Sequence, residues 1–329
     1  MLLRFYRNSH PSSFFTIPFI ALLCWIPFII IRPQTFIVQV PDAMPIYEWL
    51  YSGISRLHIW LQLTISWLLI SIQAIYLNQL IVKHELFPRL SFLPALIFMT
   101  LSVLFPDMMQ IQPVLLVNLI LLMVMDKIFL LYKNPEPLRQ VFNASFLLGI
   151  ATLIDSSAIV FYLYLLLSFV ILLPFYWRVW IISFVAFALP YYFISIYFFL
   201  TDSLAGFWLQ KIPKALRFMQ FVPPHLKPLQ IATLSIILLL FILSAYSVSR
   251  HFYRNIIRIR RYFQLIFLYI IFSLLTLLFT KTVSLQSICV LVIPFSIFLS
   301  YFFLQLKRKT FAEILFVLMV VFIILVRFS

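Results

Sequence analysis

Positive charges occur in every second break between the long apolar runs of this chain. Short loops that are rich in Lys and Arg stay on the cytoplasmic side of a membrane. The alternation therefore predicts a protein that crosses a membrane repeatedly, with its N-terminus inside. The basic clusters in alternate breaks are Arg4/Arg7, Lys83/Arg89, Lys127/Lys133/Arg139, Arg178, Arg250 to Arg261, and Lys307/Arg308/Lys309.

The composition supports the same fold class. Of the 329 residues, 64% are hydrophobic and only 10% are charged, whereas a soluble domain has about 25% charged residues. A spanning helix needs about 20 residues, so about eleven spans fit. We predict an all-α polytopic transmembrane helix bundle in the inner membrane, one integral domain over residues 1–329 with its C-terminus outside. The expected spans are about 13–32, 57–81, 90–105, 112–132, 141–154, 157–175, 178–200, 229–248, 264–279, 283–304 and 311–327.

Several function classes are excluded or disfavoured. The formal charge of +15 does not indicate nucleic-acid binding, because the basic residues flank apolar spans where topology and anionic headgroups explain them. Three glycines cannot form a Walker A loop, a dinucleotide-binding loop or a GxxxG seam. Cys24 and Cys289 lie in apolar segments and are interpreted as buried hydrophobic residues.

Two external loops, about 33–56 and 201–228, hold most candidate site residues. We consider Asp42, Glu48 and Asp107 as catalytic carboxylates, because such a group acts as a general base or binds a divalent cation. Asp42 and Asp107 converge if the early spans pack together. The alternative is structural: Asp42 caps a short interfacial helix over 44–54, Asp107 lies in a turn, and Asp155 caps the sixth span.

The fourth external loop, about 201–228, breaks the charge rule, because it is basic although it is placed outside. Lys211, Lys214 and Arg217 follow at three-residue spacing, and Lys227 stands near the loop's end. We interpret these four residues as a binding site for a lipid-linked phosphate or pyrophosphate. The alternative is ordinary anchoring to anionic headgroups.

Other polar residues are assigned to the inner side or to the spans. The inward segment places Arg250, Arg254, Arg258 and Arg261 on one helical face, which predicts inner-leaflet lipid contact or docking of a cytoplasmic partner. Asp126, next to Lys127, lies near the inner end of its span, either in a proton relay or reaching the interface. Polar residues inside spans are expected to bond neighbouring helices; they are Gln73, Asn78 and Asn118.

Two resemblances follow from these stretches. The segments 78–89 (NQLIVKHELFPR), Phe105-Pro106, 142–154 (FNASFLLGIATLI) and 187–192 (FALPYY) resemble a polytopic inner-membrane family of Bacteroidota that has no established activity. The layout of the external loops is similar to the membrane module of the GT-C glycosyltransferases. That likeness implies an acid in the first external loop and a second acid in the next, positions that Asp42 or Glu48 and Asp107 occupy here, although the first loop lacks an adjacent acidic pair.

The leading hypothesis is therefore a GT-C-like envelope glycosyltransferase that uses a polyprenyl-phosphate-linked sugar. The alternatives are a non-enzymatic membrane subunit of an envelope assembly or secretion complex, and a lipid or solute transporter. The partners expected are membrane lipids, a polyprenyl-phosphate lipid and, for the subunit hypothesis, a protein. No cofactor is implied beyond a divalent cation at the carboxylates, and no nucleic acid is expected.

Overall fold

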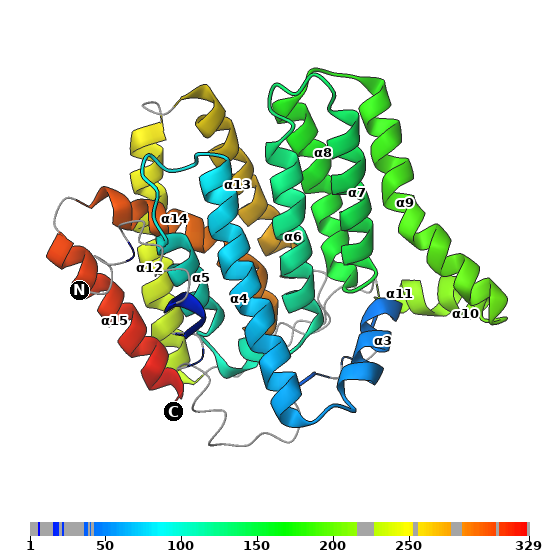
Figure 1. Ribbon diagram of the computed structural model, residues 1–329, viewed down its shortest axis with the longest axis horizontal. Coiled ribbons are helices and arrows are strands. Elements are labelled where there is room, and N and C mark those ends of the chain that lie inside the picture. The colour runs from blue at the N-terminus through cyan, green and yellow to red at the C-terminus, as the bar shows by residue number, and fades with distance from the viewer. Residues whose placement is uncertain are drawn as a thin grey trace.

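The described part of the chain forms an all-helical bundle, as the sequence predicts (Figure 1). The computed structural model describes residues 6, 16–19, 22, 36–38, 40, 43–215, 227–252, 256–277, 285–306 and 309–327. The helices are α3 Pro45–Ile54, α4 Ile59–Lys83, α5 Leu93–Ser102, α6 Pro113–Phe129, α7 Leu138–Thr152, α8 Val160–Leu172, α9 Trp177–Leu200, α10 Leu204–Gly206, α11 Ile212–Ala215, α12 Pro228–His251, α13 Ile257–Thr276, α14 Val292–Gln305 and α15 Lys309–Arg327. Shorter turns are the 3₁₀-helices η1 Pro106–Met109, η2 Ser156–Ile159 and η6 Leu285–Leu291, and the π-helix η3 Phe207–Lys211.

Five helices in the described ranges are long and apolar enough to cross a membrane, which fits a membrane protein. They are Ile59–Lys83, Trp177–Leu200, Pro228–Arg250, Ile257–Thr276 and Ile288–Gln305. Each span expected from 57–81 onward coincides with a helix, whereas the first, 13–32, lies outside the described residues except for 16–19 and 22. Some of these helices are short. α5 has 10 residues, and at a rise of about 1.5 Å per residue a helix of this length is too short to cross a hydrocarbon core of about 30 Å.

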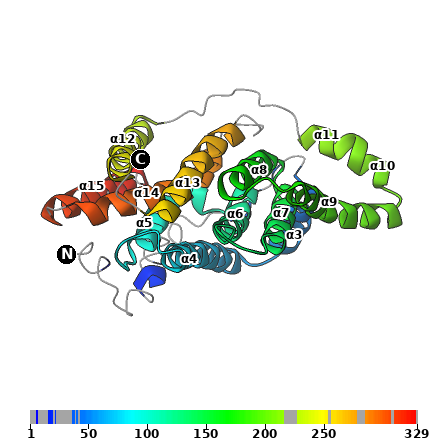
Figure 2. The same cartoon turned by 90° about the horizontal axis from the view of Figure 1, so that it is seen from above.

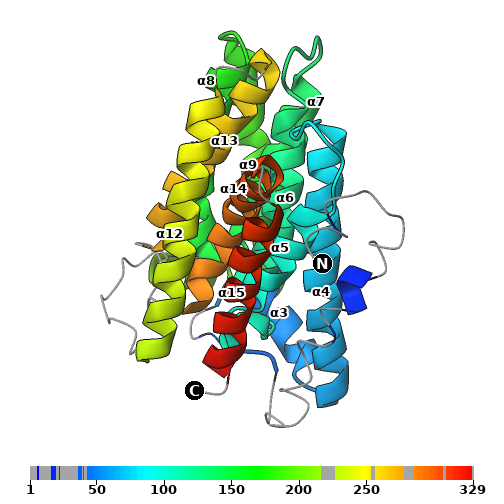
Figure 3. The ribbon, with the colours of Figure 1, turned by 90° about the vertical axis from the view of Figure 1, so that its left-hand side faces the viewer.

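The helices that carry lipid-facing surface are recognised by exposed aromatic side chains. On α9, Phe184 is 67% exposed and Phe193 is 59% exposed, and only 28% of its apolar window is buried inside the protein. A soluble protein rarely exposes so large an apolar surface. On the other side of the bundle α12 packs against α14 and α15, as Figure 3 shows.

The basic connections lie at one end of the bundle. The turns from α4 to α5, α6 to α7 and α8 to α9 lie in the upper half of Figure 1, as do the end of α12 and the start of α13, whereas α3, α10 and α11 lie at the lower end. This arrangement follows the alternation of charge along the sequence. We refer to these as the basic end and the loop end.

Several helices begin with a proline, and three are followed by a non-glycine residue in the left-handed conformation. A proline stands in the first turn of α3, α5, α6 and α12, where its fixed φ suits the helix and its missing N–H costs nothing. With few glycines available, three other residues take the left-handed backbone conformation: Glu85 (φ 51°), Lys133 (φ 53°) and Asp202 (φ 50°). Each follows the end of a long helix, where glycine is the usual residue.

The tightest helix contact joins α7 to α9. A Cβ atom at Gly149 would lie 2.7 Å from the carbonyl oxygen of Phe187 and 3.0 Å from Cγ of Pro190. The Ser145 and Ser183 hydroxyls lie 2.9 Å apart across the same interface, and Tyr191 donates to Thr152 Oγ1 at 2.9 Å. Small and hydroxyl-bearing residues therefore let the two backbones approach, as is common between membrane helices. The segments 142–154 and 187–192 meet at this contact.

The first prediction concerns Lys133. Replacing this exposed residue with glycine should stabilise the protein by about 1 kcal/mol, because a left-handed backbone is strained for a residue with a Cβ atom. Thermal unfolding of the full chain in detergent measures the change. Lys133→Ala is the control, because it removes the charge and keeps the strain; equal effects of the two substitutions would contradict the explanation.

The second prediction concerns Gly149. Gly149→Ala should destabilise the protein by about 1–3 kcal/mol, because the added methyl group meets a backbone oxygen that cannot move aside. Gly53→Ala in α3 is the matched control, since nothing lies within 4 Å of its added Cβ atom. If both variants melt at the wild-type temperature, the close approach of α7 and α9 is not a constraint on stability.

Candidate functional site

The first external loop, about 33–56, is joined by backbone hydrogen bonds to the second, which connects α5 to α6. These bonds lie at the loop end. Ile37 and Ile111 form a parallel bridge, in which Ile111 N–H donates to Phe36 at 2.9 Å and Val38 N–H donates to Ile111 at 3.0 Å. The Phe36 N–H also donates to Gln62 Oε1 of α4 at 2.9 Å. These two loops therefore meet through their backbones, whereas the predicted convergence of Asp42 with Asp107 stays a prediction because Asp42 lies outside the described residues.

The helix predicted over 44–54 is present as α3, and it contacts two further connections. Ile46 N–H donates to the carbonyl of Leu153 at 3.3 Å, which ties α3 to the turn after α7. The Tyr47 hydroxyl is buried and donates to the carbonyl oxygens of Val38 at 2.5 Å and Ile111 at 3.3 Å. Burial raises the pKa of Tyr47, so the phenol stays protonated and remains a donor.

The fourth loop completes this group through an ion pair. Lys211, in the π-helix η3, donates to the Glu48 carboxylate of α3. Trp49 lies edge-on to Tyr197 of α9, with ring centroids 5.0 Å apart, and Phe207 is buried and stacks on Phe198 at 4.7 Å. The structure thus brings together two predicted site residues that are 163 positions apart.

A cavity of about 270 Å³ lies beside this ion pair and opens at the surface of α9. Its wall is almost entirely apolar and aromatic and includes Met44, Ile159, Phe184, Tyr191, Trp208 and Ile212. Neither Glu48 nor Lys211 lines the cavity, but Met44 is one helical turn before Glu48 and Ile212 directly follows Lys211, so the ion pair lies close to the cavity wall. Trp208 is held in place by a hydrogen bond from its Nε1 to Ser195 Oγ at 3.1 Å.

The other predicted external residues have different outcomes. Asp42 and Arg217 lie outside the described residues. Asp107 is exposed on η1, and desolvation by neighbouring groups raises its pKa. Asp155 caps η2, accepting from Ser157 N–H at 3.0 Å, which confirms its structural role.

The basic residues of the fourth external loop do not form one cluster. Lys214 is exposed on α11, three positions after Lys211. Lys227 instead precedes α12, and Figure 2 shows α11 and α12 on opposite sides of the bundle. The structure therefore does not place Lys227 with Lys211 and Lys214.

The prediction that four arginines share one helical face is wrong. α12 ends at His251 and α13 begins at Ile257, so Arg250 and the pair Arg258 and Arg261 belong to different helices. Ile256 has an extended backbone (ψ 150°) that interrupts the helical path. Arg250 and Arg261 are exposed, and Arg254 lies outside the described residues.

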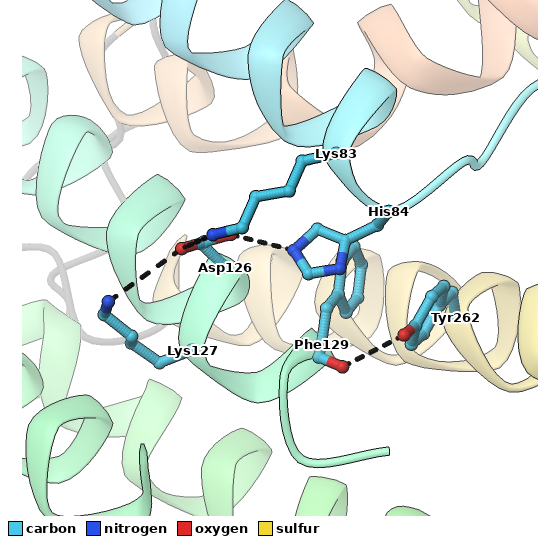
Figure 4. A network of polar contacts seen from close by, with 6 residues as sticks. All are labelled: Lys83, His84, Asp126, Lys127, Phe129 and Tyr262. Carbon is cyan, nitrogen blue, oxygen red and sulfur yellow. Dashed lines mark hydrogen bonds and ion pairs between the residues drawn. The ribbon is translucent and has the colours of Figure 1, made fainter. Parts of the chain in front are cut away.

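A second polar cluster, at the basic end, was not foreseen as a unit (Figure 4). The Asp126 side chain is only 6% exposed and accepts from Lys83 Nζ at 2.9 Å and from His84 Nε2 at 2.8 Å. Lys127 Nζ lies 4.0 Å from the same carboxylate. Because an ionised carboxylate only accepts hydrogen bonds, His84 donates through Nε2.

Aromatic rings hold His84 in position. It packs edge-on against Phe129 and Tyr262, at centroid distances of 5.2 Å and 5.8 Å. Tyr262 in turn donates to the carbonyl oxygen of Phe129 at 3.0 Å, which ties α13 to the end of α6. The cluster joins the ends of three helices and compensates the charge of a buried acid, as burial requires.

The sequence contained a signal for this cluster. Asp126 falls in the last two turns of an apolar helix, and Lys83 and His84 close the neighbouring helix at the same end. The alternation of basic loops places both helix ends on one side, so the pairing follows once α4 and α6 are known to be neighbours. Among the described residues, no group of three His, Cys, Asp or Glu side chains is arranged to hold a metal ion.

Comparison of the chain with protein-family models, with curated proteins and with solved structures finds no match. The candidate sites therefore rest on their own geometry, and both resemblances remain hypotheses.

The third prediction tests the charge compensation at the basic end. Asp126→Asn should lower the free energy of unfolding by about 2 kcal/mol. The substitution removes the negative charge that strengthens the hydrogen bonds from Lys83 and His84, and it leaves the Lys83 ammonium without a counter-charge. The Lys83 side chain is 50% exposed and can turn to water. The loss of stability therefore comes mainly from the weakened hydrogen bond of buried His84. Glu136→Gln makes the same acid-to-amide change at an exposed site and should leave the melting temperature unchanged. Equal melting shifts for the two variants would contradict this role of Asp126.

Proposed function

We propose that this chain is a GT-C-like glycosyltransferase of the inner membrane that takes its sugar from a polyprenyl-phosphate donor. The proposal includes about eleven spans, an inside N-terminus and an outside C-terminus. In this orientation the loop end faces the external side and the basic end faces the cytoplasm. Transfer then takes place where the external loops meet.

One observation carries the proposal: a cation and a carboxylate from different loops meet close to an apolar cavity that is lined partly by α9. Lys211 suits a phosphate, because an ammonium is a strong charged donor. Aromatic and aliphatic walls suit an isoprenoid chain, which has no polar groups to satisfy. Glu48 supplies the acid that the GT-C likeness implies for the first external loop.

The chemistry follows from these positions. An acceptor hydroxyl attacks the anomeric carbon of the donor sugar, the bond from that carbon to the phosphate oxygen breaks, and polyprenyl phosphate leaves. The hydroxyl proton passes to a carboxylate acting as general base, for which Glu48, Asp42 and Asp107 are the proposed candidates. Lys211 and Lys214 stabilise the charge of the departing phosphate.

The ion pair itself has a consequence for this chemistry. While Lys211 contacts Glu48, the two charges neutralise each other; a phosphate that engages Lys211 competes with the carboxylate for the ammonium hydrogens. Glu48 is then released near the reacting centre as a free base. Its side chain is 47% exposed, so it can turn without unpacking the core.

The fourth prediction separates phosphate binding from transfer. Lys211→Gln should weaken binding of a long-chain polyprenyl phosphate to the full-length protein roughly tenfold, the cost of one charge-assisted hydrogen bond. Glu48→Gln should retain or tighten that binding and lower transfer of sugar from a polyprenyl-phosphate hexose. Binding is measured by native mass spectrometry from detergent, with the parent polyprenol as the uncharged comparison.

Lys133→Gln, which removes a cation at the other end of the bundle, is the control and should bind like the wild type. Equal binding of polyprenol and polyprenyl phosphate would overturn the phosphate site. Binding without any transfer in the wild type would instead favour a non-enzymatic membrane subunit, and movement of the lipid across a vesicle bilayer would favour a transporter.

A further inference from the structure

A second cavity, of about 480 Å³, lies at the basic end, on the far side of the bundle from the proposed transfer site. It lies between the end of α4, the turn over 85–91 and the first turn of α13. Its wall combines acidic, basic and hydroxyl groups with aliphatic side chains. The charged and hydroxyl groups are Glu85, Arg89, Ser91 and Arg258.

The backbone presents Glu85 to this cavity at a conformational cost. Glu85 has φ 51°, and the N–H groups of Glu85 and Leu86 donate to Val82 and Ile81 at 3.1 Å and 3.0 Å. This pattern closes a helix and usually places glycine at the left-handed position. The Glu85 carboxylate accepts from Arg258 of α13 but is 71% exposed, so it retains capacity to accept further hydrogen bonds.

Two more groups in the cavity have unused hydrogen-bonding capacity. Ser91 is 4% exposed, and within the described part of the chain its Oγ has no hydrogen-bond partner. Such a buried hydroxyl is costly unless a ligand or water satisfies it. Arg89 is exposed, and no ion pair or hydrogen bond joins its side chain to another described residue.

The apolar part of the wall indicates which kind of ligand fits. Ile81, Val82, Leu90, Ile256 and Ile259 line the same cavity, and Leu90 is 60% exposed. A polar pocket with an aliphatic rim at the end of membrane helices matches the boundary between headgroups and acyl chains. A free soluble anion has no apolar part that would cover these aliphatic side chains.

We propose that this cavity binds the headgroup of a phospholipid that carries both a phosphate and a primary ammonium, as phosphatidylethanolamine does. Arg89 and Arg258 contact the phosphate oxygens, and the Ser91 hydroxyl donates to one of them. The ammonium donates to Glu85, and the start of the acyl chains covers the aliphatic rim.

The charges distinguish this ligand from other phospholipids. An anionic headgroup without an ammonium would bring its phosphate to the two arginines while leaving Glu85 facing negative charge. A quaternary ammonium, as in phosphatidylcholine, has no N–H groups to donate to the carboxylate. The pairing of one acid with two guanidinium groups therefore favours the primary amine.

The fifth prediction is tested by exchanging defined lipids into the full-length protein in detergent and counting bound lipids by native mass spectrometry. The wild type should retain phosphatidylethanolamine in preference to phosphatidylglycerol and phosphatidylcholine. Arg89→Gln should weaken binding of both phosphatidylethanolamine and phosphatidylglycerol roughly tenfold, the effect of one charged hydrogen bond. Glu85→Gln should abolish the preference for phosphatidylethanolamine while phosphatidylglycerol still binds.

Arg178→Gln is the matched control, because it removes an exposed arginine from another basic connection; it should bind all three lipids like the wild type. Soluble phosphoethanolamine tests whether the acyl rim matters, and its displacement of the lipid at equal concentration would overturn the lipid assignment. Equal retention of the three lipids by the wild type, or equal loss in Arg89→Gln and Arg178→Gln, would overturn the site.

Discussion

The arrangement of the loop end depends on backbone hydrogen bonds that lie outside the helices. In a chain this apolar, a buried N–H or carbonyl without a partner is costly. The segment before α3 satisfies its backbone through Ile111 of the second loop, and the start of α3 does so through Leu153 of the third. These bonds hold α3 across the end of the bundle, and only then does Glu48 lie within reach of Lys211.

Four of the acids in the described part of the chain have a defined partner or capping role. Glu48, Glu85 and Asp126 pair with bases from other helices or loops, and Asp155 caps a helix. Buried Asp126 requires its partners, because an uncompensated charge in this environment would be strongly destabilising. The exposed pairs, Lys211 with Glu48 and Arg258 with Glu85, contribute little stability. Their main effect is to position charged groups. With a net charge of +15, the chain has many more cations than acids to pair with them.

Much of the architecture was predictable from the sequence, and the site was predictable only in part. Apolar runs of helical length, with prolines at their starts, define helices wherever the chain folds in lipid. The short helix over 44–54 and the cap by Asp155 follow from local residue preferences and are confirmed. The single helical face for Arg250, Arg254, Arg258 and Arg261 is wrong, because periodicity cannot show that one helix ends at His251 and the next begins at Ile257.

Contacts between distant segments required the structure. Glu48 and Lys211 are 163 positions apart, and Glu85 and Arg258 are 173 positions apart. Nothing in the local sequence indicates either pair, because partner choice depends on which helices pack together. Gly149 likewise required the structure, because only the close approach of the Phe187 carbonyl shows why a residue without a Cβ atom is needed there.

By itself, the sequence determined that this is a helical, membrane-type chain with its basic connections on one side, because hydrophobicity and charge act residue by residue. The tertiary structure alone decided which charges meet, which cavities they border and which hydroxyls remain without partners. Those properties arise from packing between helices and from hydrogen bonds between loops, and both couple residues that are far apart along the chain.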